Sequence, residues 1–426
     1  MHAWKRPEIP SVPGASDAPW LHDTATDTLV EARPINVARL YVCGITPYDA
    51  THLGHAATYL AFDTLQRVWL DAGFQVHYAQ NVTDIDDPLL ERAAKTGVDW
   101  RELAQSQVEL FRTDMEALGI IPPNDYVAVT EVIDEVADAV AQLRSAGLAY
   151  EVETGDAVAG ADGVTGSDLY FDIAAAEART DWRLGDESNL NRDTMLALFA
   201  ERGGDPDRPG KRDALDPMLW RAAREGEPQW PSAVGAGRPG WHIECSVIAL
   251  KELGTDFTVQ GGGSDLIFPH HDMSAGHASA LSGHPLAGVY SHTGMVAYQG
   301  EKMSKSLGNL VLVSGLRSQG VDPRAIRLAL LAQHYRNNWA WTEDLLSAAE
   351  HRLARYRAAF ASASASPIAH PASSAAVIEK MRESLRADLN SPGALLALDA
   401  AADGVDDPGL LADAVDALLG VNLRGS

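Results

Sequence analysis

Residues 37–82 read VARLYVCGITPYDATHLGHAATYLAFDTLQRVWLDAGFQVHYAQNV. The apolar run Val37–Val42 predicts a buried strand, and the run Gln75–Val82 predicts a second one. Between them, over residues 52–72, apolar side chains recur at helical spacing until a glycine follows, which predicts a helix. Strand, helix and strand in one short stretch form a βαβ unit, so we expect a parallel sheet that binds ligands at the carboxyl ends of its strands.

Further elements are predicted along the rest of the chain. Residues 100–147 show a helical pattern, and two strand patterns between residues 148 and 173 resemble a hairpin. Strand patterns return at Asp256–Gln260 and Gly288–Val296, and the remaining chain is helical apart from an Ala/Ser/Pro-rich linker at 361–375.

The predicted fold class is therefore α/β, with a split, Rossmann-like parallel sheet that binds a nucleotide, a helical and hairpin insertion, and a helical C-terminal region. The expected segments are an irregular N-terminal segment (1–36), the first half of the sheet domain (37–110), a connective insertion (111–205), the second half (206–300), a loop with its following helices (301–345) and a small helical C-terminal domain (346–426).

The chain of 426 residues carries 34 basic and 59 acidic side chains, which gives a formal net charge of −25. A protein that grips nucleic acid needs a basic surface, so we expect no nucleic-acid partner, although an acidic chain can carry a local basic patch. The simpler interpretation of the charge is a solvated surface that aids solubility. No run of about 18 apolar residues is present, so we expect no membrane partner and a cytoplasmic location.

Two histidines, His52 and His55, flank Gly54 where the first helix is expected to begin. Backbone N–H groups and the helix dipole attract phosphate at such a position, and imidazoles add donors for charge that develops on phosphorus. Taken alone, such histidines are more often surface or capping residues. The pattern makes both of them candidate catalytic residues.

A second motif, KMSKS, spans residues 302–306. Its lysines, Lys302 and Lys305, could clamp a triphosphate and neutralise departing pyrophosphate, although a solvated loop is the alternative. With the upstream histidine motif and the split sheet between them, this motif resembles the signature of the class I aminoacyl-tRNA synthetases. That resemblance implies activation of a carboxylate by ATP with Mg²⁺, and a catalytic role for both lysines.

The only cysteines, Cys43 and Cys245, form a candidate metal site with His270 or His271, because thiolate and imidazole are zinc ligands. Their spacing matches no compact zinc finger, and each cysteine alone could be a small buried apolar residue. Three local segments, however, resemble cysteinyl-tRNA synthetase, and the resemblance implies that Cys43, Cys245 and His270 bind one Zn²⁺. These segments are YVCG (41–44), GWHIECS (240–246) and GGGSDLIFPHH (261–271).

The chain departs from the synthetase pattern at Ser274, where the synthetases have a glutamate as a fourth ligand. Three protein ligands leave one coordination position open, and the sulfur of a substrate cysteine suits it far better than a hydroxyl. Asp272 is the alternative fourth ligand.

Two further segments, 43–51 and 201–206, resemble the cysteine ligases of mycothiol biosynthesis, a family paralogous to cysteinyl-tRNA synthetase. This resemblance implies that ATP and L-cysteine form a cysteinyl-adenylate, which is joined to the amine of glucosaminyl-inositol. The scarcity of basic and aromatic residues after Trp341 agrees with an acceptor other than tRNA. The candidate acceptor-side motif comprises Glu201, Arg202, Gly203, Gly204, Asp205 and Pro206.

The same resemblance implies an adenylate and substrate site spread over the strand ends. Its residues would be Cys43, Gly44, Ile45, Thr46, Thr58, Asn81, Val82, Thr83, Trp241, Gly263, Ser264, Asp265, Val296 and Ala297. Two alternatives stay open: a cysteinyl-tRNA synthetase with a shortened C-terminal region, and a non-catalytic protein that binds cysteine or its adenylate. The second is disfavoured because a pure binder needs no pyrophosphate clamp.

Overall fold

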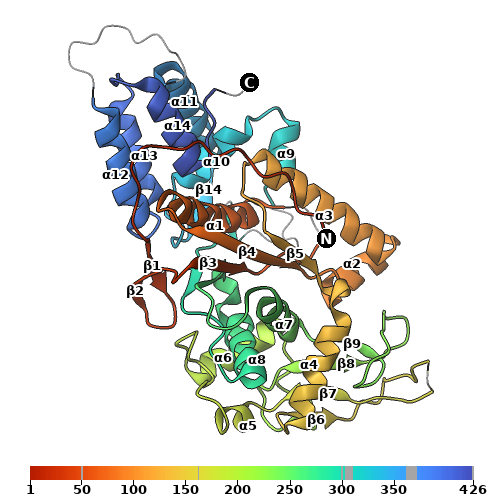
Figure 1. Ribbon diagram of the computed structural model, residues 1–426. Coiled ribbons are helices and arrows are strands. Elements are labelled where there is room, and N and C mark those ends of the chain that lie inside the picture. The colour runs from red at the N-terminus through yellow and green to blue at the C-terminus, as the bar shows by residue number, and fades with distance from the viewer. Residues whose placement is uncertain (49–50, 162, 299–300, 303–309, 361–371, 425–426) are drawn as a thin grey trace.

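The computed structural model describes residues 1–48, 51–161, 163–298, 301–302, 310–360 and 372–424. Its main sheet has five parallel strands in the order β11-β10-β3-β4-β5 (Figure 1). Both strands predicted from the opening stretch are confirmed at their bounds. The strands are β3 (Val37–Val42), β4 (Gln75–Val82), β5 (Asp125–Ala128), β10 (Val259–Gly263) and β11 (Tyr290–Thr293).

The strand order reverses between β3 and β10, so a crevice is expected at their carboxyl ends. Helix α1 (Leu53–Asp71) lies over one face of the sheet, and α7 (Trp241–Leu253) and α8 (Asp272–Ser282) lie on the other (Figure 1). The predicted first helix is thus confirmed. It is buried almost all round, because the C-terminal helices cover the side of α1 that faces away from the sheet.

The insertion is built around a four-stranded antiparallel sheet, β6-β7-β8-β9, at the bottom of Figure 1. The predicted hairpin between residues 148 and 173 is confirmed as β6 and β7. The elements here are α4 (Ile133–Ser145), β6 (Ala149–Val152), β7 (Asp168–Phe171), α5 (Ile173–Glu177), α6 (Arg192–Glu201), β8 (Met218–Ala222) and β9 (Gly237–Pro239).

The boundaries expected for the insertion differ from the structure at both ends. Strand β5 interrupts the region predicted to be helical and pairs with β4 in the main sheet, so residues 125–128 do not belong to the insertion. Strands β8 and β9 pair with β7, so the insertion's sheet continues beyond residue 205. Short strands paired across long loops leave no local pattern, which is why periodicity missed them. Helices α2 (Asp87–Thr96) and α3 (Trp100–Ala117) precede β5.

The N-terminal segment, expected to be irregular, contains a hairpin of β1 (Trp20–Asp23) and β2 (Thr28–Glu31). Asp27 in its turn has a φ of 52°, a left-handed conformation that aspartate tolerates better than most residues. The turn lets the two short strands pair, so the expectation for residues 1–36 was wrong at this point.

The C-terminal third packs against α1 rather than standing apart. Its buried residues, among them Leu385 and Leu418, belong to the same apolar cluster as Val42 of the main sheet. Among the described residues, no helix is both long and apolar enough to span a bilayer. The remaining elements are β12 (Val296–Tyr298), β13 (Glu301–Lys302), α9 (Val313–Ser318), α10 (Pro323–Leu331), β14 (Trp339–Trp341), α11 (Glu343–Phe360), α12 (Ser374–Arg386), α13 (Ser391–Ala401) and α14 (Pro408–Leu419).

Candidate active site

A cavity of about 280 Å³ lies in the crevice at the carboxyl ends of β3 and β10. It brings together most residues that the sequence predicted for the adenylate. Those that line it are Cys43, Gly44, Ile45, Thr46, His52, His55, Thr58, Trp241, Gly263, Asp265 and Val296. Asn81, Val82, Thr83, Ser264 and Ala297 do not line it.

The two histidines of the first motif lie at the start of α1 with their rings stacked, 3.8 Å between centroids. Nδ1 of His52 accepts hydrogen bonds from the backbone N–H groups of Gly54 (3.1 Å) and His55 (3.4 Å), so His52 is the N-cap of α1. The capping interpretation is therefore correct for His52. Both rings also line the cavity, at a helix start that favours phosphate.

The end of β3 closes tightly against the end of β4. The backbone N–H of Gly44 donates to Oδ1 of Asn81 (2.8 Å), and a Cβ at Gly44 would lie only 1.6 Å from the Asn81 carbonyl oxygen. Thr83 donates its backbone N–H to the carbonyl of Ile45 (3.0 Å). Asn81 and Thr83 thus hold Gly44 and Ile45 in place from behind the cavity wall, and only a glycine fits at position 44.

Three side chains from distant parts of the chain form a compact donor set: Cys43 after β3, Cys245 on α7, and His270 in the turn before α8. Their Sγ and ring nitrogen atoms all lie within 4.8 Å of one another, and all three residues are buried. Cys43 also lines the crevice cavity. Two thiols and an imidazole are ligand types that suit a Zn²⁺ ion, and Cys43 places this donor set beside the cavity.

The two thiols differ in acidity because they are coupled to each other. Burial raises the pKa of Cys43. The pKa of Cys245 is lowered by a hydrogen bond from Cys43 and, in addition, by the nearby His270. The pair therefore favours one thiolate, the form that binds a metal.

The imidazoles around this donor set fix its orientation. Nδ1 of His270 lies 3.0 Å from Nδ1 of His242, which leaves Nε2 of His270 for a metal. His271, the alternative ligand, sits 3.3 Å from the Cys43 Sγ, while its other ring nitrogen lies 2.7 Å from His292. Burial lowers the pKa of His242 and of His271, so both rings are neutral at pH 7. His271 is therefore placed to support Cys43 rather than to join the donor set.

Neither Ser274, at the position of the synthetase glutamate, nor Asp272, the alternative fourth ligand, belongs to the donor set. The Ser274 hydroxyl donates to the backbone carbonyl of His242 (3.2 Å). Oδ1 of Asp272 accepts a hydrogen bond from the backbone N–H of Gly185 (3.0 Å). Asp272 also lies beside Glu187, and burial together with Asp272 raises the pKa of Glu187 to about 10. Neither side chain joins the donor set of Cys43, Cys245 and His270.

The motif at residues 201–206 lies behind the site, and none of its residues lines the crevice cavity. Arg202 donates to the backbone carbonyls of Asp265 and Phe268, which flank the turn that leads to His270. The Asp205 carboxylate accepts from Tyr170 Oη and from Lys211 Nζ (2.9 Å for Lys211). The contacts of this motif therefore position other residues of the insertion and of the site.

The second signature motif cannot be placed in full. Residues 303–309, including Lys305, lie outside the described residues, and the side chain of Lys302 does as well. The backbone of Lys302 pairs with Ala297, which joins the start of the motif to β12 beside the cavity. The roles of both lysines stay predictions.

Six lining residues were not among the predicted site residues: Tyr48, Gly54, Tyr59, Leu266, Gly294 and Met295. Helical spacing was a usable signal for Tyr59, because this residue lies four residues after His55 on the same face of α1. Its hydroxyl donates to the Cys43 carbonyl (3.1 Å). Gly294 and Met295 come from a turn after β11 that no local pattern marks.

The sheet order, the crevice and the split insertion define the catalytic domain of a class I synthetase, and a family model described as "tRNA synthetases class I (C) catalytic domain" matches residues 30–351. The methionyl-tRNA synthetase of Mycobacterium tuberculosis, solved in complex with methionyl-adenylate, is similar in fold, with a TM-score of 0.61. The match has 17% identity and covers 89% of this chain and 82% of that one.

Two similar proteins identify the family within this class. An L-cysteine:1D-myo-inositol 2-amino-2-deoxy-alpha-D-glucopyranoside ligase of Clavibacter michiganensis subsp. michiganensis is 64% identical, with 99% of each chain covered. The protein of the same name from Paenarthrobacter aurescens is 55% identical and covers 99% of this chain and 100% of its own. The chain belongs to this family of cysteine ligases within the class I synthetases.

Proposed function

We propose that this protein uses ATP to join L-cysteine to the amine of glucosaminyl-inositol, with release of AMP and pyrophosphate, the reaction that the names of its relatives describe in part. One observation carries the choice of cysteine. The Cys43, Cys245 and His270 donor set opens, through Cys43, into the cavity whose other walls hold the phosphate-binding helix start.

The donor set supports direct selection of the amino acid by its sulfur. A Zn²⁺ ion held by these residues would supply a soft Lewis acid that takes the substrate thiolate and rejects the hydroxyl of serine. The neutral ring of His271 and the side-chain amide of Gln260 both contact the Cys43 Sγ, the amide Nε2 at 3.4 Å. These contacts hold the Cys43 side chain in its orientation.

In the first half-reaction, the cysteine carboxylate attacks the α-phosphorus of ATP, and the bond from that phosphorus to pyrophosphate breaks. Mg²⁺ bound to ATP supplies charge neutralisation for the phosphates. His52 and His55 line the cavity at the α1 start, where they stabilise the charge that develops on the α-phosphate. Lys302 and Lys305 are the expected pyrophosphate clamp.

In the second half-reaction, the neutral amine of the acceptor attacks the acyl carbon of the cysteinyl-adenylate. A C–N bond forms, the bond to AMP breaks, and one proton leaves the nitrogen. The acidic surface, with a net charge of −25, supports a small acceptor in place of tRNA.

The decisive experiment measures AMP release by the purified protein with ATP, Mg²⁺ and cysteine, and the mass of the product. One reaction contains glucosaminyl-inositol and the other cysteine tRNA. We expect an amide of cysteine and the aminosugar in the first reaction only. Charged tRNA without the amide would make the protein a synthetase, and no product with either acceptor would make it a binding protein.

A further inference from the structure

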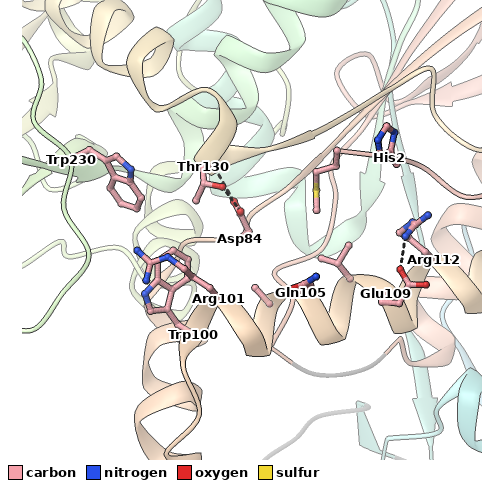
Figure 2. A pocket seen from close by; sticks show the side chains of 12 residues that line it. His2, Asp84, Trp100, Arg101, Gln105, Glu109, Arg112, Thr130 and Trp230 are labelled. Atoms are coloured by element: carbon pink, nitrogen blue, oxygen red, sulfur yellow. Dashed lines mark hydrogen bonds and ion pairs between the residues drawn. The ribbon is translucent and has the colours of Figure 1, made fainter.

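One wall of the crevice is formed by the backbone that follows β11. Residues 294–296 line the crevice there, and the hydroxyl oxygens of Thr293, just before them, and Thr58 on α1 lie 2.8 Å apart. We refer to residues 294–296 as the β12 wall. Another cavity, which lies along α3 in Figure 2, shares no lining residue with the crevice. The shape of the crevice therefore depends on its own walls and on what holds them.

The β12 wall is bonded to the loop that precedes β14. The backbone N–H of Gly294 donates to the carbonyl of Tyr335 (2.8 Å), and that of Met295 donates to Oδ1 of Asn338 (2.7 Å). A Cβ at Gly294 would lie only 2.1 Å from the carbonyl oxygen of Asn337, so glycine alone permits this close approach. Because the two segments are in direct contact, a shift of the loop moves the wall with it.

The loop is held in turn by the carboxylate of Asp388, which lies between α12 and α13. Tyr335 Oη donates to Oδ1 of Asp388 (2.6 Å), and Arg336 Nε donates to Oδ2 (2.6 Å). Nε2 of His334 lies 3.7 Å from the same Oδ2. The side chain of Asp388 is only 8% exposed, and hydrogen bonds to a charged group are about twice as strong as neutral ones. Asp388 is therefore the anchor of the loop.

The position of Asp388 is fixed by strand β1. Asp388 and Leu389 have φ values of 57° and 49°, left-handed conformations that cost energy in residues other than glycine. The backbone N–H of Asp388 donates to the carbonyl of Trp20 (2.9 Å), and that of His22 donates to Oδ1 of Asp388 (3.1 Å). Strained backbone persists where the surrounding structure determines it, so this carboxylate has little freedom to move.

We infer that Asp388 is a positioning residue for ATP, because it sets the β12 wall through Tyr335 and Arg336. This inference rests on the proposed function, which places ATP and cysteine together in the crevice. The donor set reaches the crevice through Cys43 at the end of β3, whereas the wall follows β11, and β10 lies between these two strands. The sulfur of cysteine belongs at the donor set, so the nucleotide is the substrate that meets the wall.

Two substitutions weaken the anchor without adding bulk. Asp388→Asn removes the charge, and asparagine tolerates the left-handed conformation, while Tyr335→Phe removes only a hydroxyl. The matched control is Asp71→Asn. Asp71 on α1 is 9% exposed and pairs with Arg382 of α12, so it also ties the C-terminal helices to the sheet domain, but among the described residues it has no hydrogen bond to the loop. The KM values for ATP and cysteine in cysteine-dependent pyrophosphate exchange, and the zinc content, are the measurements.

We expect both anchor variants to raise the KM for ATP about three- to tenfold, while the KM for cysteine and the zinc content stay within about twofold of the wild type. The control should match the wild type in all three. An unchanged KM for ATP in both variants overturns the inference, as does an equal rise in the control or in the KM for cysteine. If Asp388→Asn does not fold, Tyr335→Phe decides alone. A wild type without cysteine-dependent exchange refutes the proposed function instead.

Discussion

At the scale of single residues, the donor set consists of two buried sulfur atoms and one buried ring nitrogen. Cys43 and Cys245 are both buried and both free of disulfides, which for most cysteines would mean simple packing. What distinguishes them is the imidazole of His270, which completes a set of three donors beside a cavity. The chemistry therefore depends on atoms that a hydroxyl cannot replace.

We expect Cys245→Ser to lose bound zinc and cysteine-dependent exchange, because serine provides no thiolate at neutral pH. Metal content by atomic emission and the exchange rate are the measurements. Ser274→Ala is the matched control and should keep its zinc, because the Ser274 hydroxyl bonds the His242 carbonyl instead of facing the donors. Full zinc content and activity in Cys245→Ser would disprove the metal site.

At the scale of elements, the site depends on the turn between β10 and α8, which carries Asp265 and His270. The turn is pinned from outside by Arg202, at the end of α6, through two backbone carbonyls. Three adjacent glycines in β10 let the sheet pack closely here, since a Cβ at Gly261 would meet the ring of Phe62 at 2.4 Å. The insertion thus holds this turn through the side chain of Arg202.

We expect Arg202→Ala to lower kcat/KM for cysteine in the exchange reaction by about 10–100-fold, the usual loss when the support of a metal ligand is removed. Arg192→Ala is the control, because that side chain is half-exposed on the same helix and pairs only with Asp213 among the described residues. Wild-type kinetics in Arg202→Ala would show that the turn keeps its shape without this anchor.

At the scale of the whole molecule, a buried ion network joins the sheet domain to the C-terminal helices. Asp63 on α1 accepts from Arg67 (2.8 Å) and from Arg327 on α10. Both arginines also donate to backbone carbonyls near the ends of α3 and α14, including those of Gly119 and Leu419. Because one apolar cluster runs through both parts, we expect the sheet domain and the C-terminal helices to unfold together.

We expect Asp63→Asn to lower the free energy of unfolding by about 3–5 kcal/mol at pH 7, because it leaves two buried guanidinium groups without their carboxylate. Urea titration measures this loss. Glu151→Gln, which breaks the half-exposed pair with Arg144, is the control and should cost far less. A loss as small as that of the control would show that Asp63 does not join the two parts.

The same network predicts a dependence on pH. Burial raises the pKa of Asp63, but Arg327 and Arg67 outweigh it and hold that pKa below its ordinary value. Because the folded-state pKa is the lower one, the stabilisation is complete above the unfolded-state value of about 4 and is lost as the pH falls through the folded-state pKa. The gap between wild type and Asp63→Asn should therefore narrow only in strong acid.

Much of the site could be predicted from short segments of the sequence, because many of its residues directly follow a strand or begin a helix. The pattern of Val37–Val42 and Gln75–Val82 determined two central strands, since each is a contiguous apolar run buried on both faces. The motif around His52 marked the start of a helix for the same local reason. Strand β5 and the pair β8 and β9 escaped, because short strands owe their pairing to distant partners.

The sequence by itself determined the βαβ core and the start of α1 at His52, because each follows from neighbours along the chain. Only the tertiary structure decided that His270 joins the cysteines, that His271 contacts Cys43 from outside the donor set, and that Asp272 accepts from Gly185. It alone also brought Trp241 and Val296 into the same cavity as the residues that follow β3. Residues from distant segments meet at one site only because those segments pack together, and no local periodicity predicts this packing.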